Sequence, residues 1–279
     1  MIAISYVDYA LWDIKGKWLS QPVHKVLGGP MQQKIPAYAS TAGFSLEPSK
    51  AAERVAQIRE EGYCGSKWFF RSGVGDGRTG EKKNIDLMEA LRDASGPNMD
   101  VMIDAWANWG VPYTLRMADL LKDYKPAWIE EPLQYSHYDS YLHLREKSSI
   151  PIAGGEHEFT RWGAKNVLEE KTFDIYQFEP VWAGGFSEML KIGALVTAHN
   201  ATYIPHVYLP AASAHVAFTF NQMTVPMLEY HYILGEIYQF FLENPTRPEK
   251  GYFHPPTHPG IGITIDEAKV EKDKIINFD

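Results

Sequence analysis

Residues 101–156 read VMIDAWANWGVPYTLRMADLLKDYKPAWIEEPLQYSHYDSYLHLREKSSIPIAGGE and contain three acidic residues spaced 26 positions apart. Asp104, Glu130 and Glu156 each follow a short apolar run, and a helical pattern separates one acid from the next. In a parallel α/β fold, carboxylates at the C-terminal ends of successive strands converge on one end of the sheet. Three oxygen ligands with room for water suit Mg²⁺ better than Zn²⁺. The pattern predicts a magnesium site; the alternative is that each acid only caps the helix that follows it.

The same alternation of apolar runs and helical periods continues on both sides of this segment. Strands are predicted at 35–39, 66–70, 174–178, 202–205 and 226–230, and in the runs that end at Asp104, Glu130 and Gly154. Helices are predicted between them at 48–61, 84–92, 112–123, 138–147, 160–170, 186–198 and 211–220. Eight strands with seven intervening helices predict a TIM-type barrel of the modified (β/α)7β form.

Three segments are predicted at the level of domains. Residues 1–33 form a helical lead-in, 34–232 form the barrel, and 233–279 form a tail that packs outside it. Residues 71–80, with four glycines, are expected to be a long mobile connection, and 260–265 are expected to be a late strand.

Charge and composition exclude several classes of function. The net charge is −8 and no basic stripe is present, which argues against nucleic acid or an anionic membrane as partner. A single cysteine, Cys64, excludes an internal disulfide framework. Neither a signal peptide nor an apolar run of membrane-spanning length is found, so a cytoplasmic location is expected. The predicted barrel has an uncovered mouth and is followed by a tail rich in Pro and aromatic residues. These surfaces predict that the protein forms a homo-oligomer.

Further polar residues follow the later strands. Glu179 and His206 end adjacent predicted strands, and a carboxylate beside a histidine can fix its tautomer and raise its basicity. This pair therefore predicts a general base, although a lone histidine is commonly a structural hydrogen-bonding residue. Glu229 follows the eighth strand and is expected to face the same cavity; its alternative is a salt-bridged or solvated loop acid.

Two more residues are candidates for contact with the substrate. His157 directly follows Glu156 and is expected at the edge of the metal site. Lys67 lies within the second predicted strand beside Trp68 and Phe69, where it could act as a second base or bind substrate.

Sequence motifs also resemble a known family. VDYALWDIKGK at 7–17, QPVHKVLGG at 21–29 and WIEEP at 128–132 closely resemble segments of the mandelate racemase/muconate lactonizing branch of the enolase superfamily. MIDAW at 102–106, DIYQ at 174–177 and VWAGG at 181–185 resemble its acid-sugar dehydratases of the rhamnonate dehydratase type. The resemblance runs from about residue 7 to residue 229.

The resemblance implies roles for individual residues. It implies Mg²⁺ on Asp104, Glu130 and Glu156, His206 as the acid/base catalyst with Glu179 as its partner, and Glu229 near the substrate carboxylate. The implied reaction is dehydration of a sugar acid to a 2-keto-3-deoxy acid through removal of the α-proton and stabilisation of the enediolate.

Three features depart from the family pattern. Many relatives have Lys-x-Lys at the second strand, whereas this chain has Lys67-Trp68-Phe69, which disfavours a two-base racemase. The partner of the histidine is usually Asp, and Glu179 is one methylene longer. Relatives also carry a large N-terminal capping domain, so the sequence is expected to be a fragment or to have lost the cap. The alternatives to a dehydratase are a racemase or epimerase of the same branch and a truncated, non-catalytic barrel.

Overall fold

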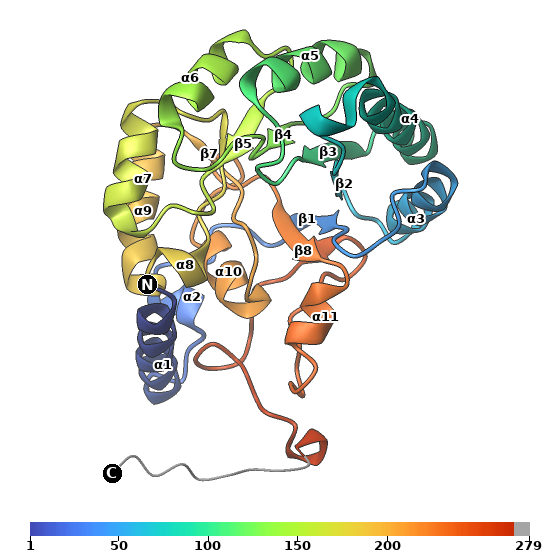
Figure 1. Cartoon of the computed structure of the whole chain (residues 1–279). Coiled ribbons are helices and arrows are strands. Elements are labelled where there is room, and N and C mark those ends of the chain that lie inside the picture. The colour runs from blue at the N-terminus through green and yellow to red at the C-terminus, as the bar shows by residue number, and fades with distance from the viewer. Residues whose placement is uncertain (271–279) are drawn as a thin grey trace, which may run out of the picture.

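A parallel sheet forms the centre of the computed structural model, which describes residues 1–270 (Figure 1). Its strands are β1 (Ile35–Ser40), β2 (Gly65–Phe69), β3 (Asp100–Asp104), β4 (Ile129–Glu130), β5 (Ile152–Gly154), β6 (Ile175–Tyr176), β7 (Thr202–Tyr203) and β8 (Leu228–His231). They are hydrogen-bonded in the order β7-β6-β5-β4-β3-β2-β1-β8, and all seven pairings are parallel. The backbone N–H of Tyr203 donates to the carbonyl of Thr224, 2.8 Å away, and so ties β7 to the segment before β8. The predicted TIM-type α/β fold is confirmed.

Helices cover the outer face of this sheet, as the arc in Figure 1 shows. They are α3 (Pro48–Glu60), α4 (Gly77–Ser95), α5 (Val111–Leu121), α6 (Tyr138–Lys147), α7 (Thr160–Glu169), α9 (Phe186–Ala198) and α10 (Pro210–Ala217). Most have an apolar stripe at helical spacing, which in α4 is Leu87, Met88 and Leu91, all buried, whereas all eight residues of α10 are buried. Burial of these stripes against the sheet gives the main core of the molecule.

A smaller cluster fills the inside of the barrel and sets the direction of the site residues. It contains Tyr38, Met102 and Trp128, which come from β1, β3 and the start of β4. Side chains alternate along a strand, so Asp104 lies on the same face as Met102, and Glu130 on the same face as Trp128. The apolar inner residues therefore form a floor beneath the acidic ones.

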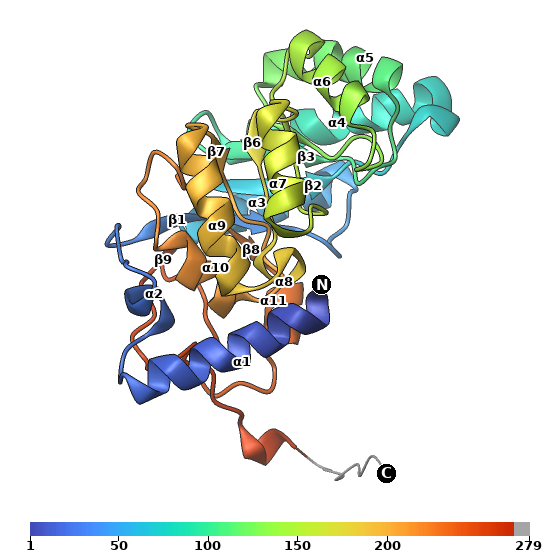
Figure 2. The same cartoon turned by 90° about the vertical axis from the view of Figure 1, so that its left-hand side faces the viewer.

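The N-terminal segment packs on one side of the barrel (Figure 2). It consists of α1 (Ile2–Trp18) and α2 (Val23–Val26), and α1 contacts α8 (Pro180–Ala183) and α9. Asp8 accepts a hydrogen bond from the backbone N–H of Ser187, 3.1 Å away, in the first turn of α9. Asp13 accepts one from the N–H of Ile261, 2.9 Å away, so both acids of the motif at 7–17 attach α1 to other parts of the chain.

The C-terminal segment contains α11 (Leu234–Tyr238), β9 (Tyr252–Phe253), which pairs antiparallel with the start of β1, and the 3₁₀ turn η3 (Glu267–Lys269). The prediction of a strand at 260–265 was wrong. Only isolated bridges form there, because Gly260 and Gly262 have φ of 72° and 78°, outside the extended region. The part of the predicted tail at 271–279 lies outside the described residues.

The connection predicted at 71–80 was also partly wrong. It contains a short 3₁₀ turn, η1 (Val74–Asp76), and α4 begins already at Gly77. A second 3₁₀ turn, η2 (Lys122–Tyr124), extends α5. Within residues 1–270, none of the helices combines the length and apolarity needed to cross a membrane.

Candidate active site

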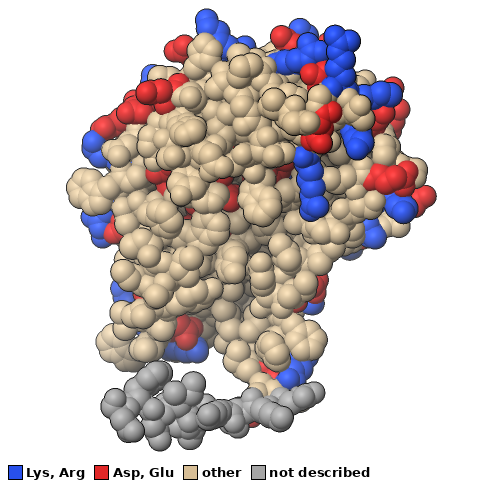
Figure 3. Space-filling model, viewed as in Figure 1, with Lys and Arg blue, Asp and Glu red and all other residues tan. Residues whose placement is uncertain are grey.

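A cavity of about 310 Å³ lies at the C-terminal ends of the strands. This position is where barrel enzymes of this fold carry their catalytic residues. Its polar lining includes Lys67, Asp104, Glu156, His206 and His231. Its other lining residues are Ala42, Phe69, Arg71, Trp106, Trp182, Tyr208, Leu234 and Tyr238. In the space-filling view, the charged side chains lie mainly around the upper and lateral rim of the molecule, most of the central and lower face is uncharged, and a few acidic atoms show at its centre (Figure 3).

Glu179 and His206 form the dyad that their strand-end positions predicted. Nδ1 of His206 lies 2.8 Å from a carboxylate oxygen of Glu179, whose side chain is fully buried. Glu179 also accepts hydrogen bonds from the backbone N–H groups of Val181 (2.8 Å) and Tyr208 (2.7 Å). The extra methylene of Glu179 is therefore accommodated, and its carboxylate is fixed by three donors. Nε2 of His206 is left to face the cavity.

Lys67 lies at the centre of the buried acidic residues. Its ammonium forms an ion pair with Glu130, lies 2.8 Å from a carboxylate oxygen of Glu229 and 3.6 Å from one of Asp104. The side chain is 1% exposed. Burial alone lowers the pKa of Lys67, but the carboxylates of Glu130 and Glu229 raise it well above its ordinary value. Lys67 is therefore a protonated, paired cation and not a free base.

The three predicted metal ligands differ in how well their oxygens are bonded. Glu130 is bonded to Lys67 and accepts from Trp128 Nε1 (3.0 Å) and Gln177 Nε2 (2.7 Å). Among residues 1–270, Asp104 accepts only from the backbone N–H of Trp106, 2.9 Å away. The side chain of Glu156 has no hydrogen bond within the described chain; Nε2 of His206 lies 3.5 Å from one of its oxygens.

The electrostatics of Asp104 and Glu156 fit a bound dication. Burial raises the pKa of Asp104 well above its ordinary value, and the neighbouring Glu130 raises it further. Burial also raises the pKa of Glu156 to about 7, with Glu131 adding to the effect. Buried carboxylates that lack donors are stabilised by a cation. Since all three donors are hard oxygens, the residues fit Mg²⁺.

The closest groups of candidate ligand atoms are, however, different from the predicted trio. Over residues 1–270, ligand atoms within 4.8 Å of one another come from Glu131, Glu156 and His157, and from His206, Glu229 and His231. Asp104, Glu130 and Glu156 do not form such a group, because Glu130 turns towards Lys67 and Gln177. The assignment of these three acids to the metal stays a prediction.

The remaining predicted residues lie around the cavity without lining it. His157 bonds Glu131 through Nδ1 at 2.8 Å and stacks on Tyr135, with ring centroids 4.7 Å apart. Glu229 is fully buried and accepts a hydrogen bond from the backbone N–H of Val207 at 3.1 Å, in addition to its contact with Lys67. Lys67 and His231 lower the pKa of Glu229 despite its burial. Contact of His157, Glu229 or Lys67 with a substrate stays a prediction.

Sequence reasoning missed three residues of the site. Glu131 follows Glu130 directly, and the carboxylate-rich WIEEP segment was a signal for it. His231 follows Glu229 by two residues, so strand alternation places both on the inner face. Gln177 donates to Glu130 from beyond the end of β6, and no local pattern distinguishes it.

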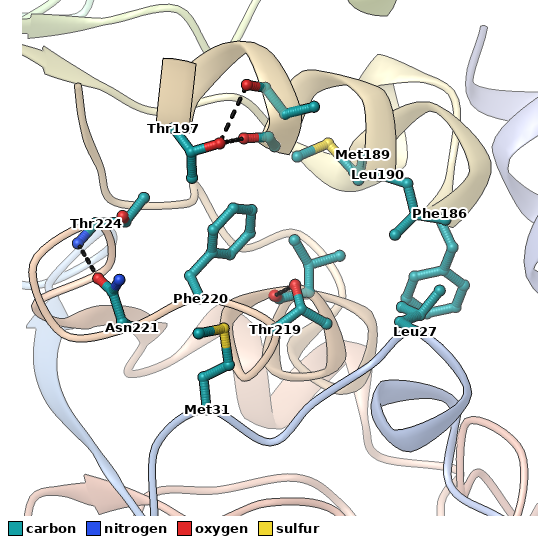
Figure 4. A pocket seen from close by; sticks show the side chains of 13 residues that line it. Leu27, Met31, Phe186, Met189, Leu190, Thr197, Thr219, Phe220, Asn221 and Thr224 are labelled. Carbon is teal, nitrogen blue, oxygen red and sulfur yellow. Dashed lines mark hydrogen bonds between the residues drawn. The ribbon is translucent and has the colours of Figure 1, made fainter. Parts of the chain in front are cut away.

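A second cavity, of about 290 Å³, lies outside the barrel between α9, α10 and the turn at Leu27–Met31 (Figure 4). Most of its lining is apolar, and its polar side chains are bonded to the nearby backbone. Thr197 donates to the carbonyl of Gly193 at 2.9 Å, and Asn221 accepts from the N–H of Thr224 at 3.0 Å. No titratable side chain lines it, so this cavity offers no group for acid–base chemistry.

Comparison with known proteins agrees with this arrangement. The family model of enolase C-terminal domain-like proteins matches residues 50–269, and that of the mandelate racemase/muconate lactonizing enzyme N-terminal domain matches residues 1–28. L-rhamnonate dehydratase from Saccharopolyspora erythraea is 33% identical over 270 residues, which are 95% of this chain and 66% of that protein. The chain thus spans slightly less than two thirds of that relative.

Solved structures show the same fold. The 3,6-anhydro-D-galactonate cycloisomerase from Zobellia galactanivorans is 30% identical, with a TM-score of 0.85 over 96% of this chain and 74% of that one. A mandelate racemase/muconate lactonizing enzyme-like protein from Roseovarius is 28% identical, also with a TM-score of 0.85, over 95% and 71% of the two chains. A barrel with a His–Glu dyad beside strand-end carboxylates, matched by the family model over most of its length, belongs to the enolase superfamily, in its mandelate racemase/muconate lactonizing branch.

Proposed function

We propose that this chain is a Mg²⁺-dependent hydro-lyase that removes water from a sugar acid and gives a 2-keto-3-deoxy acid. The observation that carries the proposal is the His206–Glu179 dyad, whose free nitrogen faces the cavity lined by Asp104 and Glu156. The similarity to L-rhamnonate dehydratase supports a substrate of the aldonate type.

The dyad can perform both proton transfers of such an elimination. Glu179 bonds Nδ1 and thereby fixes the tautomer, so Nε2 of His206 takes the proton from the α-carbon. The resulting imidazolium then gives a proton to the departing β-hydroxyl, which leaves as water while the C–O bond breaks. The α-proton and the hydroxyl leave from the same side of the substrate, because one residue serves both.

Asp104, Glu130 and Glu156 would hold the Mg²⁺. When bound, Mg²⁺ supplies Lewis-acid stabilisation for the negative charge that develops on the substrate carboxylate. The positive charge of the ion would also offset the repulsion between the buried carboxylates of Asp104 and Glu156, whose pKa values are raised by burial and by neighbouring acids. Phe69, Trp106 and Trp182 give the cavity an aromatic wall.

The geometry supports dehydration over racemisation. A racemase needs two bases on opposite faces of the α-carbon, and Lys67 is fully buried in ion pairs with Glu130 and Glu229. His231 cannot oppose His206, because their ring centroids are 5.2 Å apart, in edge contact, which leaves no room for a carbon between them. One base is therefore available, as a dehydratase requires.

The test is keto-acid formation from a panel of sugar acids with Mg²⁺ and with chelator. We expect the wild type to form product from at least one acid, and only when Mg²⁺ is present. The D104N variant should lose both turnover and affinity for Mg²⁺. The matched control is D119N, which changes an exposed acid on α5. Unchanged activity in D104N would rule out the metal assignment. No product from any acid would favour the non-catalytic barrel, and deuterium exchange at the α-carbon without product would favour a racemase.

The cellular location and the oligomeric state of the enzyme are part of the same proposal. Its acidic net charge and single cysteine support a cytoplasmic location. The homo-oligomer also stays a prediction, supported by exposed apolar residues of α1 such as Leu11, Ile14 and Trp18. A solution mass above the 31.7 kDa of one chain, measured by light scattering, would confirm it.

A further inference from the structure

His231 is the last residue of β8 and lines the same cavity as His206. Its neighbour Tyr230 points to the other face of the sheet and packs against Phe253, with ring centroids 6.1 Å apart. Alternation along the strand therefore brings the His231 ring into the barrel mouth on the side of Glu229. The proposed proton transfers make no use of it.

The His231 ring lacks a hydrogen-bond partner anywhere in residues 1–270. Its Nδ1 is fully enclosed and unbonded, and the carboxylate oxygen nearest to Nε2, on Glu229, is 3.7 Å away. The neighbouring histidines differ, since His206 is bonded to Glu179 and His157 to Glu131. A polar group that is 8% exposed and unbonded costs stability unless a ligand supplies the partner.

The surroundings of His231 indicate which chemical group that ligand presents. Lys67, paired with Glu130 and Glu229, already provides a permanent cation in the lining of the same cavity. With Nδ1 enclosed, Nε2 is the ring nitrogen of His231 that can meet a ligand in the cavity. A hydroxyl group can donate to or accept from this nitrogen in either tautomer of the ring, whereas the carboxylate of an acid is better matched by a cation.

We propose that His231 binds a hydroxyl group of the polyhydroxy acid on a carbon beyond the α-carbon, and that this contact selects among sugar acids. The inference rests on the proposed function in taking a sugar acid as the ligand. His231 then acts as a specificity residue: it positions the carbon chain while His206 handles the proton.

The test compares binding of a parent sugar acid with binding of its mono-deoxy analogues, measured by calorimetry with Mg²⁺ present. We expect H231A to weaken binding of the parent acid by about 10- to 100-fold, the effect of leaving one hydroxyl unpaired. One deoxy analogue, which lacks the contacted hydroxyl, should bind wild type and H231A equally. H231N, which keeps a donor and an acceptor, should recover part of the loss. H143A, on the exposed face of α6, should bind like wild type.

Two kinds of result would overturn this inference. Equal losses for the parent and every analogue would mean that His231 only supports the shape of the site, and urea unfolding of H231A would show the accompanying instability. No loss for any acid, or no binding of sugar acids to the wild type, would also overturn it. The keto-acid assay separates the two proposals. Selective binding without formation of product would contradict the dehydratase proposal alone. Formation of product, together with unchanged binding by H231A, would contradict the role of His231 alone.

Discussion

At the scale of single residues, the site depends on Glu179, whose buried carboxylate accepts three hydrogen bonds. Two of them come from backbone N–H groups, of Val181 in the first turn of α8 and of Tyr208 beyond β7. The carboxylate is thus held by the fold itself, and the orientation of His206 follows from it. Replacing the usual Asp by Glu does not prevent the dyad, because the longer side chain finds matching donors.

We predict that E179Q lowers kcat by about 10²- to 10⁴-fold, because an amide favours the wrong tautomer of His206 and cannot stabilise its imidazolium. The measurement is steady-state kinetics on the best sugar acid, with circular dichroism to verify folding. A kcat within a factor of two of wild type would show that His206 acts without this partner.

The Lys67 ion pairs give a second prediction at this scale. K67M leaves Glu130 and Glu229 buried without their cation, so we expect a loss of about 3–5 kcal/mol in the free energy of unfolding. Urea unfolding in the presence of chelator measures it. K82M, which removes an exposed pair with Asp86 on α4, should have a much smaller effect, because solvent screens that pair. Equal effects of the two substitutions would contradict the buried network.

At the scale of elements, neighbouring helices are joined by charged contacts. Arg161 at the start of α7 donates from its backbone N–H and its guanidinium to Glu188 in the first turn of α9. The hydrogen bond from the Arg161 side chain is the main reason that the pKa of Glu188 falls from 4.5 to about 2. This contact ties α7 to α9, which packs against α1.

The lowered pKa predicts a pH dependence of stability. A group whose pKa is lower in the folded state stabilises the fold above its unfolded pKa, and the contribution is lost as pH falls towards the folded value. We expect E188Q to be about 1 kcal/mol less stable than wild type at pH 6, after allowance for solvent screening, and the difference to disappear between pH 4.5 and about 2. Urea midpoints across this range measure it.

The control for this prediction is E169Q, which removes the exposed i,i+4 pair of α7 with Lys165. It should change stability by less than about 0.5 kcal/mol at every pH. A difference between wild type and E188Q that grows on acidification would contradict the assignment.

At the scale of the whole molecule, the candidate ligands come from three adjacent strands, β3, β4 and the end of β5. They meet only in the folded chain, so Mg²⁺ binds the folded state in preference to the unfolded one. We predict that Mg²⁺ at 100 times its Kd raises the free energy of unfolding by about 2.7 kcal/mol. Thermal or urea unfolding with Mg²⁺ and with chelator measures it. A D104N variant whose free energy of unfolding rises as much as that of wild type at the same Mg²⁺ concentration would contradict this site.

Local patterns predicted much of the architecture. The helices at 138–147 and 186–198 have the predicted bounds, because an apolar stripe and its flanking residues are contained in one segment. A helix forms within the predicted helical segment 1–33, but its apolar side chains Val7, Leu11 and Ile14 are exposed, and the buried side of α1 is formed by Ser5, Tyr9 and Gly16. Helical periodicity reveals a helix and does not say which neighbour it will contact.

The alternation of strands and helices, and the positions of Asp104, Glu130 and Glu156 at three strand ends, follow from local sequence patterns, because both are set by neighbouring residues. The same patterns predicted that Glu179 and His206 would meet. In contrast, the pairing of Lys67 with Glu130 and Glu229, and the unbonded position of His231 in the cavity, are visible only in the folded chain. Those contacts join strands that are far apart in the sequence, and they depend on side-chain directions and burial that become fixed only when the barrel forms.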